Sequence, residues 1–167
     1  MTGWWALAFA VQWILLVVVA IVVVALASQV GTLHLRLGPR GALEIDDEGP
    51  MLGEAPMPSP ATAADGRRAM LGGPGPRRVV LFSSPTCGVC AEVAPAVGPA
   101  AASAGFAAIV LHDAAAERAW NVPGTPFVAV LDEMGVVLAK GTVNNLEQVE
   151  GLVDSALERS REVAWAD

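Results

Sequence analysis

The stretch VVLFSSPTCGVC, residues 79–90, decides the fold that this sequence predicts. Its first four residues are apolar, as in a short buried strand. Residues 83–86 interrupt the apolar run, and a helix is then expected to begin at about Cys87, with Thr86 as its N-cap. The pattern therefore places Cys87 and Cys90 one turn apart at the start of a helix that directly follows a buried strand.

The sequence downstream of this stretch alternates between short apolar runs and helical patterns. The whole order is strand, helix, strand, helix, strand, strand, helix. The early helical crossover implies parallel pairing, whereas the turn at residues 132–135 implies an antiparallel hairpin. The predicted fold class is therefore α/β, with a mixed central sheet flanked by helices. The expected strands are residues 106–111, 127–131 and 136–139, and the expected helices are residues 114–120 and 145–162.

The segment upstream, residues 49–78, is rich in Pro, Gly and Ala, which is typical of a linker. Within it, Asp65-Gly66 is a strong two-residue turn signal, and residues 67–71 can form a short returning strand. The folded domain is therefore expected to start near Gly53.

The N-terminal run from Trp4 to Ala27 holds no charged residue, and Gln12 is its only strongly polar one. About 20 apolar residues suffice to cross the hydrocarbon core as a helix. A cleaved signal peptide is the alternative, since Ala25-Leu26-Ala27 resembles a cleavage site. The length of the run and the lack of Lys or Arg before it favour a retained anchor that contacts the lipid bilayer through residues 4–27.

Composition excludes several other classes of protein. The net charge of −7 and the scattered basic residues argue against a nucleic-acid partner. The chain has two cysteines, both in one CxxC, so it has no structural disulfide framework. A zinc site would need His34 and His112 at implausible spacing, and Ala91 follows Cys90 where attachment of c-type haem requires His. We expect no metal and no nucleic acid.

The cysteine pair suits thiol–disulfide exchange. Because the thiolate is the nucleophile and a helix start favours negative charge, we expect the pKa of Cys87 to lie below the value of about 8.5 for a free thiol. Cys90, one turn further, can resolve a mixed disulfide on Cys87. Such a dithiol moves two electrons without a metal or an organic cofactor.

At this point the sequence resembles the thioredoxin superfamily. Pro95 lies five residues after Cys90, where thioredoxins carry the proline that kinks the active-site helix. Gly124-Thr125-Pro126 is similar to the superfamily's cis-proline loop. The resemblance implies that Thr125 and Pro126 lie against the CxxC and present backbone to the substrate chain.

Over nearly its whole length the sequence resembles the MauD-type accessory proteins of methylamine utilisation. The apolar span, GTLHLRLGPRGAL, GEAP, DGRRAMLGG, FSSPTCGVC and DEMGVVLAKGTVNNLEQVEGL carry this resemblance, and the GxLHxRxGPxGAL pattern is the most telling part. It implies a membrane-anchored thioredoxin-like domain on the outer side. It also implies a role in forming or correcting disulfides in the small subunit of methylamine dehydrogenase, with an unidentified membrane electron donor.

The predicted organisation follows from the span and the resemblance together. Residues 1–28 form a transmembrane anchor, residues 29–52 a juxtamembrane segment and linker, residues 53–162 the thioredoxin-like domain, and residues 163–167 a tail. Arg36 and Arg40, read alone, place the domain in the cytoplasm. The whole-chain resemblance places it on the extracytoplasmic side of the cell membrane, and we follow the resemblance.

The sequence departs from the patterns that it resembles. Thioredoxins usually carry CGPC and MauD-type proteins CPVC, whereas this chain carries CGVC. Thioredoxins also bury an acidic residue behind the second cysteine, and Leu81 holds that position here. The stretch from Pro99 to Ala104 is alanine-rich where bulkier helix residues are usual. The direction of electron flow therefore stays open.

Other functions of a thioredoxin-like or cysteine-containing protein have to be weighed against this sequence. A peroxiredoxin needs Thr three residues before its cysteine and Pro further upstream, where this chain has Ser84 and Val80. A cysteine hydrolase would need a histidine base, and His112 is the only histidine of the domain. The remaining alternatives are a reductase for cytochrome c maturation and a non-enzymatic chaperone that delivers copper or haem through the CxxC.

Overall fold

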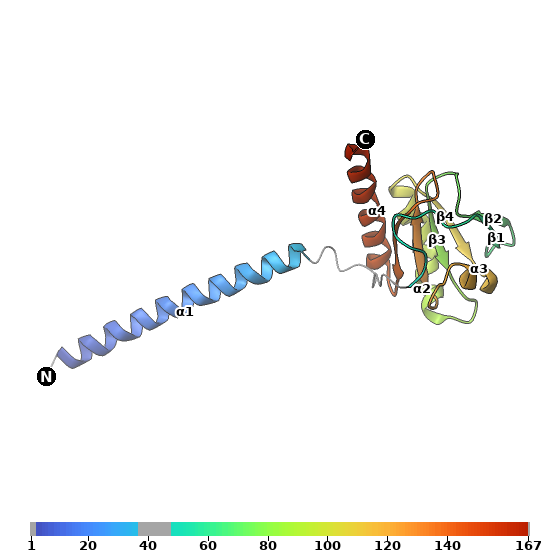
Figure 1. Ribbon diagram of the computed structural model, residues 1–167. Coiled ribbons are helices and arrows are strands. Elements are labelled where there is room, and N and C mark those ends of the chain that lie inside the picture. The colour runs from blue at the N-terminus through green and yellow to red at the C-terminus, as the bar shows by residue number, and fades with distance from the viewer. Residues whose placement is uncertain (1–2, 37–47, 167) are drawn as a thin grey trace. The chain divides into compact units, whose positions relative to one another are not determined.

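The structure is a computed structural model that describes residues 3–36 and 48–166 (Figure 1). The chain divides into two compact units, Met1–Pro39 and Arg40–Asp167, and each is described by itself. Residues 37–47 of the predicted juxtamembrane segment, including Gly38, Pro39 and Arg40, lie outside the described residues.

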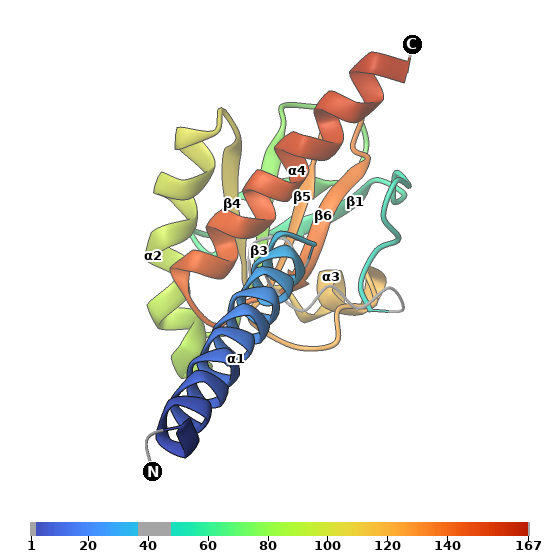
Figure 2. The ribbon, with the colours of Figure 1, turned by 90° about the vertical axis from the view of Figure 1, so that its left-hand side faces the viewer.

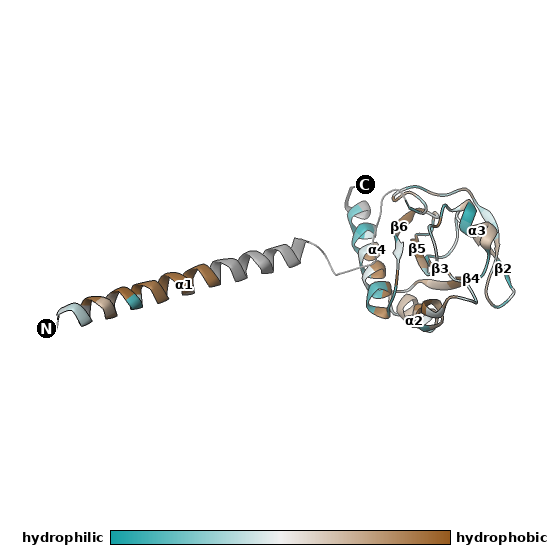
Figure 3. Cartoon of the chain, turned by 90° about the horizontal axis from the view of Figure 1, so that it is seen from below, coloured by the Kyte–Doolittle hydropathy of each residue, from teal (hydrophilic) through white to brown (hydrophobic). Residues whose placement is uncertain are grey.

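The N-terminal unit contains one helix, α1 (Gly3–Arg36, 34 residues). Its first 21 residues, Gly3–Val23, have a mean hydropathy of 2.8, and the side chains described there are exposed. Figure 3 shows this part of α1 coloured mostly as hydrophobic residues. At 1.5 Å per residue those 21 residues extend about 31 Å, which matches the thickness of a bilayer core. Length and composition would also fit a signal sequence.

The second unit is built on a four-stranded mixed sheet of strand order β4-β3-β5-β6. Strand β3 (Arg78–Phe82) pairs in parallel with β4 (Ala107–Leu111) and antiparallel with β5 (Phe127–Leu131). Strand β5 pairs antiparallel with β6 (Val137–Thr142). The predicted early crossover and late hairpin are both confirmed, and the fold is α/β and thioredoxin-like.

Helices cover both faces of this sheet. Helices α2 (Gly88–Ser103) and α4 (Leu146–Ala166) bury Val93, Val97, Val149 and Val153 on one face (Figure 2). On the other face lie the short helix α3 (Ala114–Ala119) and the hairpin of β1 (Ser59–Thr62) and β2 (Arg68–Leu71). All five residues of β3 and of β5 are buried, as two-sided covering requires.

The observed elements differ from the predicted ones mainly at their ends. Helix α4 begins at Leu146, not Asn145, and continues four residues beyond Glu162 to Ala166. Strand β6 runs to Thr142 rather than ending at Ala139. The returning strand of the Asp65-Gly66 turn is confirmed as β2, and its partner β1 is an element that the sequence reading did not name.

The segment that precedes β1 binds the free edge of β6. Gly53 donates its N–H to the Val137 carbonyl at 2.9 Å, and Val137 donates back to the Glu54 carbonyl at 2.9 Å. Further upstream, the buried Lys140 donates from Nζ to the Glu48 carbonyl at 2.7 Å. Gly53 and Glu54 therefore pair with the edge strand β6, and the Lys140 side chain holds the chain at Glu48.

Asp113 joins the hairpin to α3. Its carboxylate accepts N–H groups of Ala115 and Ala116 as the N-cap of α3 and the N–H of Thr62 at 2.9 Å. The hydrogen bonds from Ala116 and then Thr62 hold the pKa of Asp113 below its ordinary value. The carboxylate therefore stays ionised, and the cap complete, at neutral pH.

The β5–β6 turn packs tightly on the glycine-rich loop that leads into β3. Gly135 has φ +83°, and a Cβ atom there would lie 2.5 Å from the Gly73 backbone nitrogen. Gly75 donates its N–H to the Glu133 carbonyl at 2.8 Å across the same contact. Only glycine fits this approach of two backbones.

We predict that Gly135→Ala lowers the free energy of unfolding by at least about 2 kcal/mol, because left-handed strain and backbone overlap add. Gly66→Ala is the matched control: Gly66 has φ +81° but nothing within 4 Å of its Cβ position, so only the strain of about 1 kcal/mol remains. Urea denaturation of the two variants measures the difference. Equal losses would show that the two loops do not pack this closely.

Candidate functional site: the cysteine pair at the start of α2

The site begins where the buried strand β3 ends. After Phe82 the chain runs through residues 83–87, and α2 starts at Gly88. Cys87 is the N-cap, with extended backbone (φ −91°, ψ 111°), and its Sγ accepts the N–H of Cys90 at 3.1 Å. The sulfur thus occupies the position that Ser or Thr oxygen usually takes at a helix start.

The prediction that Thr86 caps this helix is wrong. The Thr86 hydroxyl lies 3.0 Å from the Ser84 hydroxyl, and the cap falls one residue later, on Cys87. The physical reason is the Ser84 turn: Cys87 donates its N–H to the Ser84 carbonyl at 3.1 Å, so the helix begins only after Cys87. This shift moves the first cysteine from the first turn to the cap itself.

Cys87 and Cys90 form a disulfide, with their Cα atoms 5.2 Å apart. The two sulfurs differ in access. Cys87 is half-buried, whereas Cys90 is 1% exposed. An external thiolate can therefore reach Cys87, and Cys90 is positioned behind it.

The predicted loop at Thr125 and Pro126 lies against this disulfide. The Thr125–Pro126 peptide bond is cis, and the Cys87 Sγ lies 3.7 Å from the Thr125 carbonyl oxygen. Pro126 is buried, and its carbonyl accepts the N–H of Val143 at 3.2 Å. The structure thus brings Cys87, Cys90, Thr125 and Pro126 together.

Pro95 lies inside α2, five residues after Cys90, and Pro99 follows in the same helix. A proline removes one helical hydrogen bond and presses on the carbonyl four residues earlier, here that of Ala91. Pro95 is exposed. Its predicted role in kinking the helix stays a prediction.

The core beneath α2 is apolar. Leu81, which holds the position of the buried acid in thioredoxins, is fully buried in the core cluster with Val93. His112, the candidate base of a cysteine hydrolase, is exposed at the end of β4. Within the described residues no group of three or more His, Cys, Asp or Glu side chains could hold a metal ion.

Sequence reasoning missed two contributors to the site. The first is the Cys90 N–H, which becomes the donor to Cys87 only because the cap falls on Cys87. The second is Val143, which fixes the Pro126 carbonyl. Only the register of β5 and β6 identifies Val143. Phe127 pairs with Thr142, and this pairing places Val143, the residue after Thr142, beside Pro126.

The fold and the site define a class: a thioredoxin-like protein with a CxxC disulfide beside a cis-proline loop, as in thiol–disulfide oxidoreductases. No family model matches the chain. Curated relatives do, and they confirm the resemblance to MauD-type proteins. The methylamine utilization protein MauD of Methylorubrum extorquens is 28% identical over 169 residues, covering 86% of this chain and 82% of the relative. MauD of Paracoccus versutus is 29% identical over 167 residues, covering 86% and 84%.

Solved structures establish the thioredoxin-like fold. A putative protein disulfide isomerase from Bacteroides thetaiotaomicron superposes with a TM-score of 0.53 at 17% identity, covering 71% of this chain and 97% of the other. A peroxiredoxin-like protein from Aquifex aeolicus gives 0.51 at 14% identity, covering 71% and 92%. A putative thiol:disulfide interchange protein DsbE from Chlorobium tepidum gives 0.50 at 17% identity, covering 68% and 97%.

The unequal burial of the sulfurs predicts unequal alkylation. In reduced protein, Cys87 alone (variant Cys90→Ser) should react with iodoacetamide about tenfold faster or more than Cys90 alone (variant Cys87→Ser). Mass spectrometry of quenched samples at neutral pH measures both rates. In urea the two rates should become similar, which controls for intrinsic reactivity. Similar rates in the folded protein would contradict the assignment of Cys87 as the accessible thiol.

Proposed function

We propose that this chain is a membrane-anchored thiol–disulfide oxidoreductase that acts on disulfides of extracytoplasmic proteins. One observation carries the proposal: a half-buried sulfur, Cys87, caps α2, contacts Thr125 and is bonded to the buried Cys90. A disulfide with one accessible sulfur beside a backbone loop is the arrangement that exchange with a protein thiol requires.

In the oxidising direction, a client thiolate attacks the Cys87 sulfur. The Cys87–Cys90 bond breaks, a mixed disulfide forms, and Cys90 leaves as a thiolate that takes up a proton. A second client thiolate then attacks the client sulfur of the mixed disulfide. Cys87 departs as a thiolate, and the client has lost two electrons to the pair. Reduction of a client runs through the same steps in reverse.

The chain's own groups stabilise the Cys87 thiolate, which departs in the oxidising direction and attacks in the reducing direction. The Cys90 N–H, 3.1 Å from the Cys87 Sγ, donates more strongly to a thiolate than to a neutral sulfur. The helix start adds favourable potential. The Thr125 carbonyl oxygen, 3.7 Å from the same sulfur, marks where an extended client backbone would pass.

The client that we propose is the small subunit of methylamine dehydrogenase. The support is the similarity to relatives described as methylamine utilization protein MauD, together with the GxLHxRxGPxGAL pattern of the sequence. The pair would form or correct disulfides in that subunit. A membrane protein would exchange electrons with the pair in each cycle.

We also propose that α1 is a retained anchor and that the domain lies outside the cytoplasm. Gly3–Val23 is long and apolar enough to span a bilayer. Disulfides persist in extracytoplasmic compartments, which suits a substrate of this kind. The two arginines that favour the opposite orientation, Arg36 and Arg40, are too few to outweigh this chemistry.

A reporter tests this orientation. Alkaline phosphatase, which is active only after export, should be active when fused to the C-terminus of the full chain in bacterial cells. The same enzyme fused to the N-terminus should be inactive and serves as the control. The reverse pattern would place the domain in the cytoplasm and overturn the localisation, while leaving the chemistry of the cysteine pair untouched.

Trapping tests the function itself. Cys90→Ser removes the resolving sulfur, so when the Cys87 thiolate attacks and breaks a disulfide bond of the client, the client should remain bound as a mixed disulfide. In cells that make methylamine dehydrogenase, non-reducing gels and mass spectrometry should recover its small subunit on Cys87.

The matched control is Cys87→Ser, which keeps only the buried sulfur and should trap nothing. Recovery of haem-attachment proteins instead would favour the reductase for cytochrome c maturation. Stoichiometric Cu(I) binding without any trapped protein would favour a metal-delivery chaperone, and the oxidoreductase proposal would fail.

A further inference from the structure

Gln12 is the one strongly polar side chain on the apolar half of α1. It is exposed, as are the other side chains described between Gly3 and Val23. By the spacing of an α-helix, Gln12 lies about 14 Å from Gly3 and about 17 Å from Val23. Its side chain is too short to reach either membrane surface from there.

A carboxamide at this depth lacks partners in lipid. The α-helix already satisfies the backbone groups, and hydrocarbon offers neither a donor nor an acceptor. Leaving a polar group without a hydrogen bond in an apolar medium is costly. Polar side chains in membrane spans therefore meet partners on neighbouring helices.

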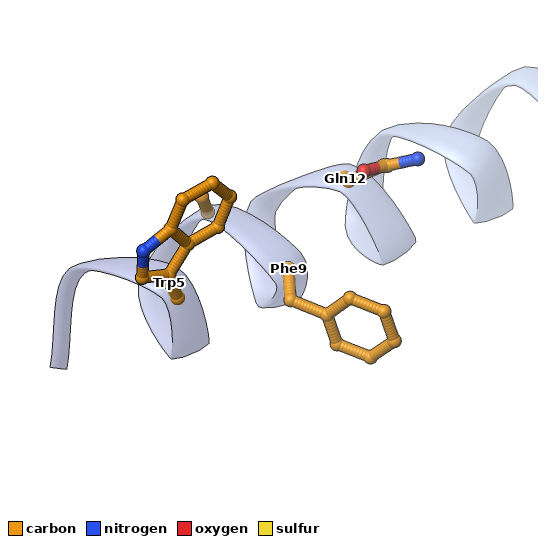
Figure 4. A pocket seen from close by; sticks show the side chains of 4 residues that line it. Trp5, Phe9 and Gln12 are labelled. Carbon is orange, nitrogen blue, oxygen red and sulfur yellow. The ribbon is translucent and has the colours of Figure 1, made fainter. Parts of the chain in front are cut away.

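Two grooves on the surface of α1 meet at Gln12. One groove is lined by Trp5, Ala8, Phe9 and Gln12, and Figure 4 shows the labelled side chains on this stretch of α1. A second groove shares Ala8 and Gln12 and continues to Leu15. The Phe9 ring packs against Trp13, with centroids 6.1 Å apart, on one side of the first groove.

Ala8 lies one turn before Gln12 and lines both grooves. A small residue there allows two helix backbones to approach closely, which brings a carboxamide on each into hydrogen-bonding reach.

We propose that this face, centred on Ala8 and Gln12, pairs α1 with the α1 of a second copy of this chain. The inference rests on the proposed anchor. Two copies inserted by the same route have the same orientation, so their helices are parallel and their Gln12 side chains lie at equal depth. A carboxamide carries both donors and an acceptor, so two Gln12 side chains satisfy each other across a two-fold axis.

Cysteine cross-linking in membranes tests the pairing face. The full chain carries Cys87→Ser and Cys90→Ser, which leaves an introduced cysteine as its only thiol. Ala8→Cys should yield a disulfide-linked dimer under mild oxidation. Ala10→Cys is the matched control, because residue 10 projects about 160° away from Gln12 on the helix and should yield little dimer.

The role of the carboxamide is tested on the Ala8→Cys chain. Adding Gln12→Leu should reduce the dimer about tenfold, and adding Gln12→Asn should keep most of it. Equal cross-linking of Ala8→Cys and Ala10→Cys, or no effect of Gln12→Leu, would overturn the inference. So would cross-linking of Ala8→Cys to a different membrane protein in place of a second copy.

Carbonate extraction separates failure of the inference from failure of the anchor. A chain that stays in the membrane with its N-terminal peptide intact, yet gives no dimer specific to Ala8→Cys, overturns the pairing alone. A chain that has lost this peptide or leaves the membrane overturns the anchor and the pairing together.

Discussion

The hydrogen bond from the Cys90 N–H to the Cys87 sulfur is the constraint on which the site depends. It can form only where a helix begins, because only there is a backbone donor without a carbonyl partner one turn earlier. The start of α2 is fixed in turn by the Ser84 turn and by the fully buried strand β3 before it. Cys87 at the cap stays half-buried while Cys90, one turn further, is buried, so the difference in access between the two sulfurs follows from where α2 starts.

The pairing of β3 with β5 explains why the cis-proline loop reaches the same place. Phe82, the last residue of β3, lies opposite Phe127, the first of β5. The chain therefore leaves β3 toward Cys87 at the same end of the sheet at which it enters β5 from Thr125. The centroids of the two phenylalanine rings lie 6.3 Å apart at this end. Two segments nearly forty residues apart meet because an antiparallel register aligns their ends, and the buried rings hold that register against slippage.

This dependence on register separates what the sequence predicts from what it does not. Strands β3 and β5, the α2 start and the proline loop follow from local patterns, since burial on both faces leaves continuous apolar runs. Strand β1, SPAT in sequence, has no such run, and it is a strand only because β2 and the Asp113 carboxylate bind its backbone. The exchange of hydrogen bonds between Gly53-Glu54 and Val137 is equally non-local. The N-cap was misplaced by one residue because Thr86 is a good cap by type, and only the Ser84 turn decides against it.

Leu81 changes what the pair requires from its surroundings. Where thioredoxins hold a carboxylate behind the second cysteine, this chain holds a fully buried side chain that cannot take up a proton. A thiolate on the buried Cys90 is therefore disfavoured by desolvation, while a thiolate on Cys87 is favoured by the Cys90 N–H. The two effects act on different steps. Stabilising the Cys87 thiolate favours the reduced pair at equilibrium, whereas burial of Cys90 slows its departure and its attack on a mixed disulfide. The direction of electron flow in a CxxC protein is therefore set by the groups around each sulfur, and the cysteine spacing alone does not determine it.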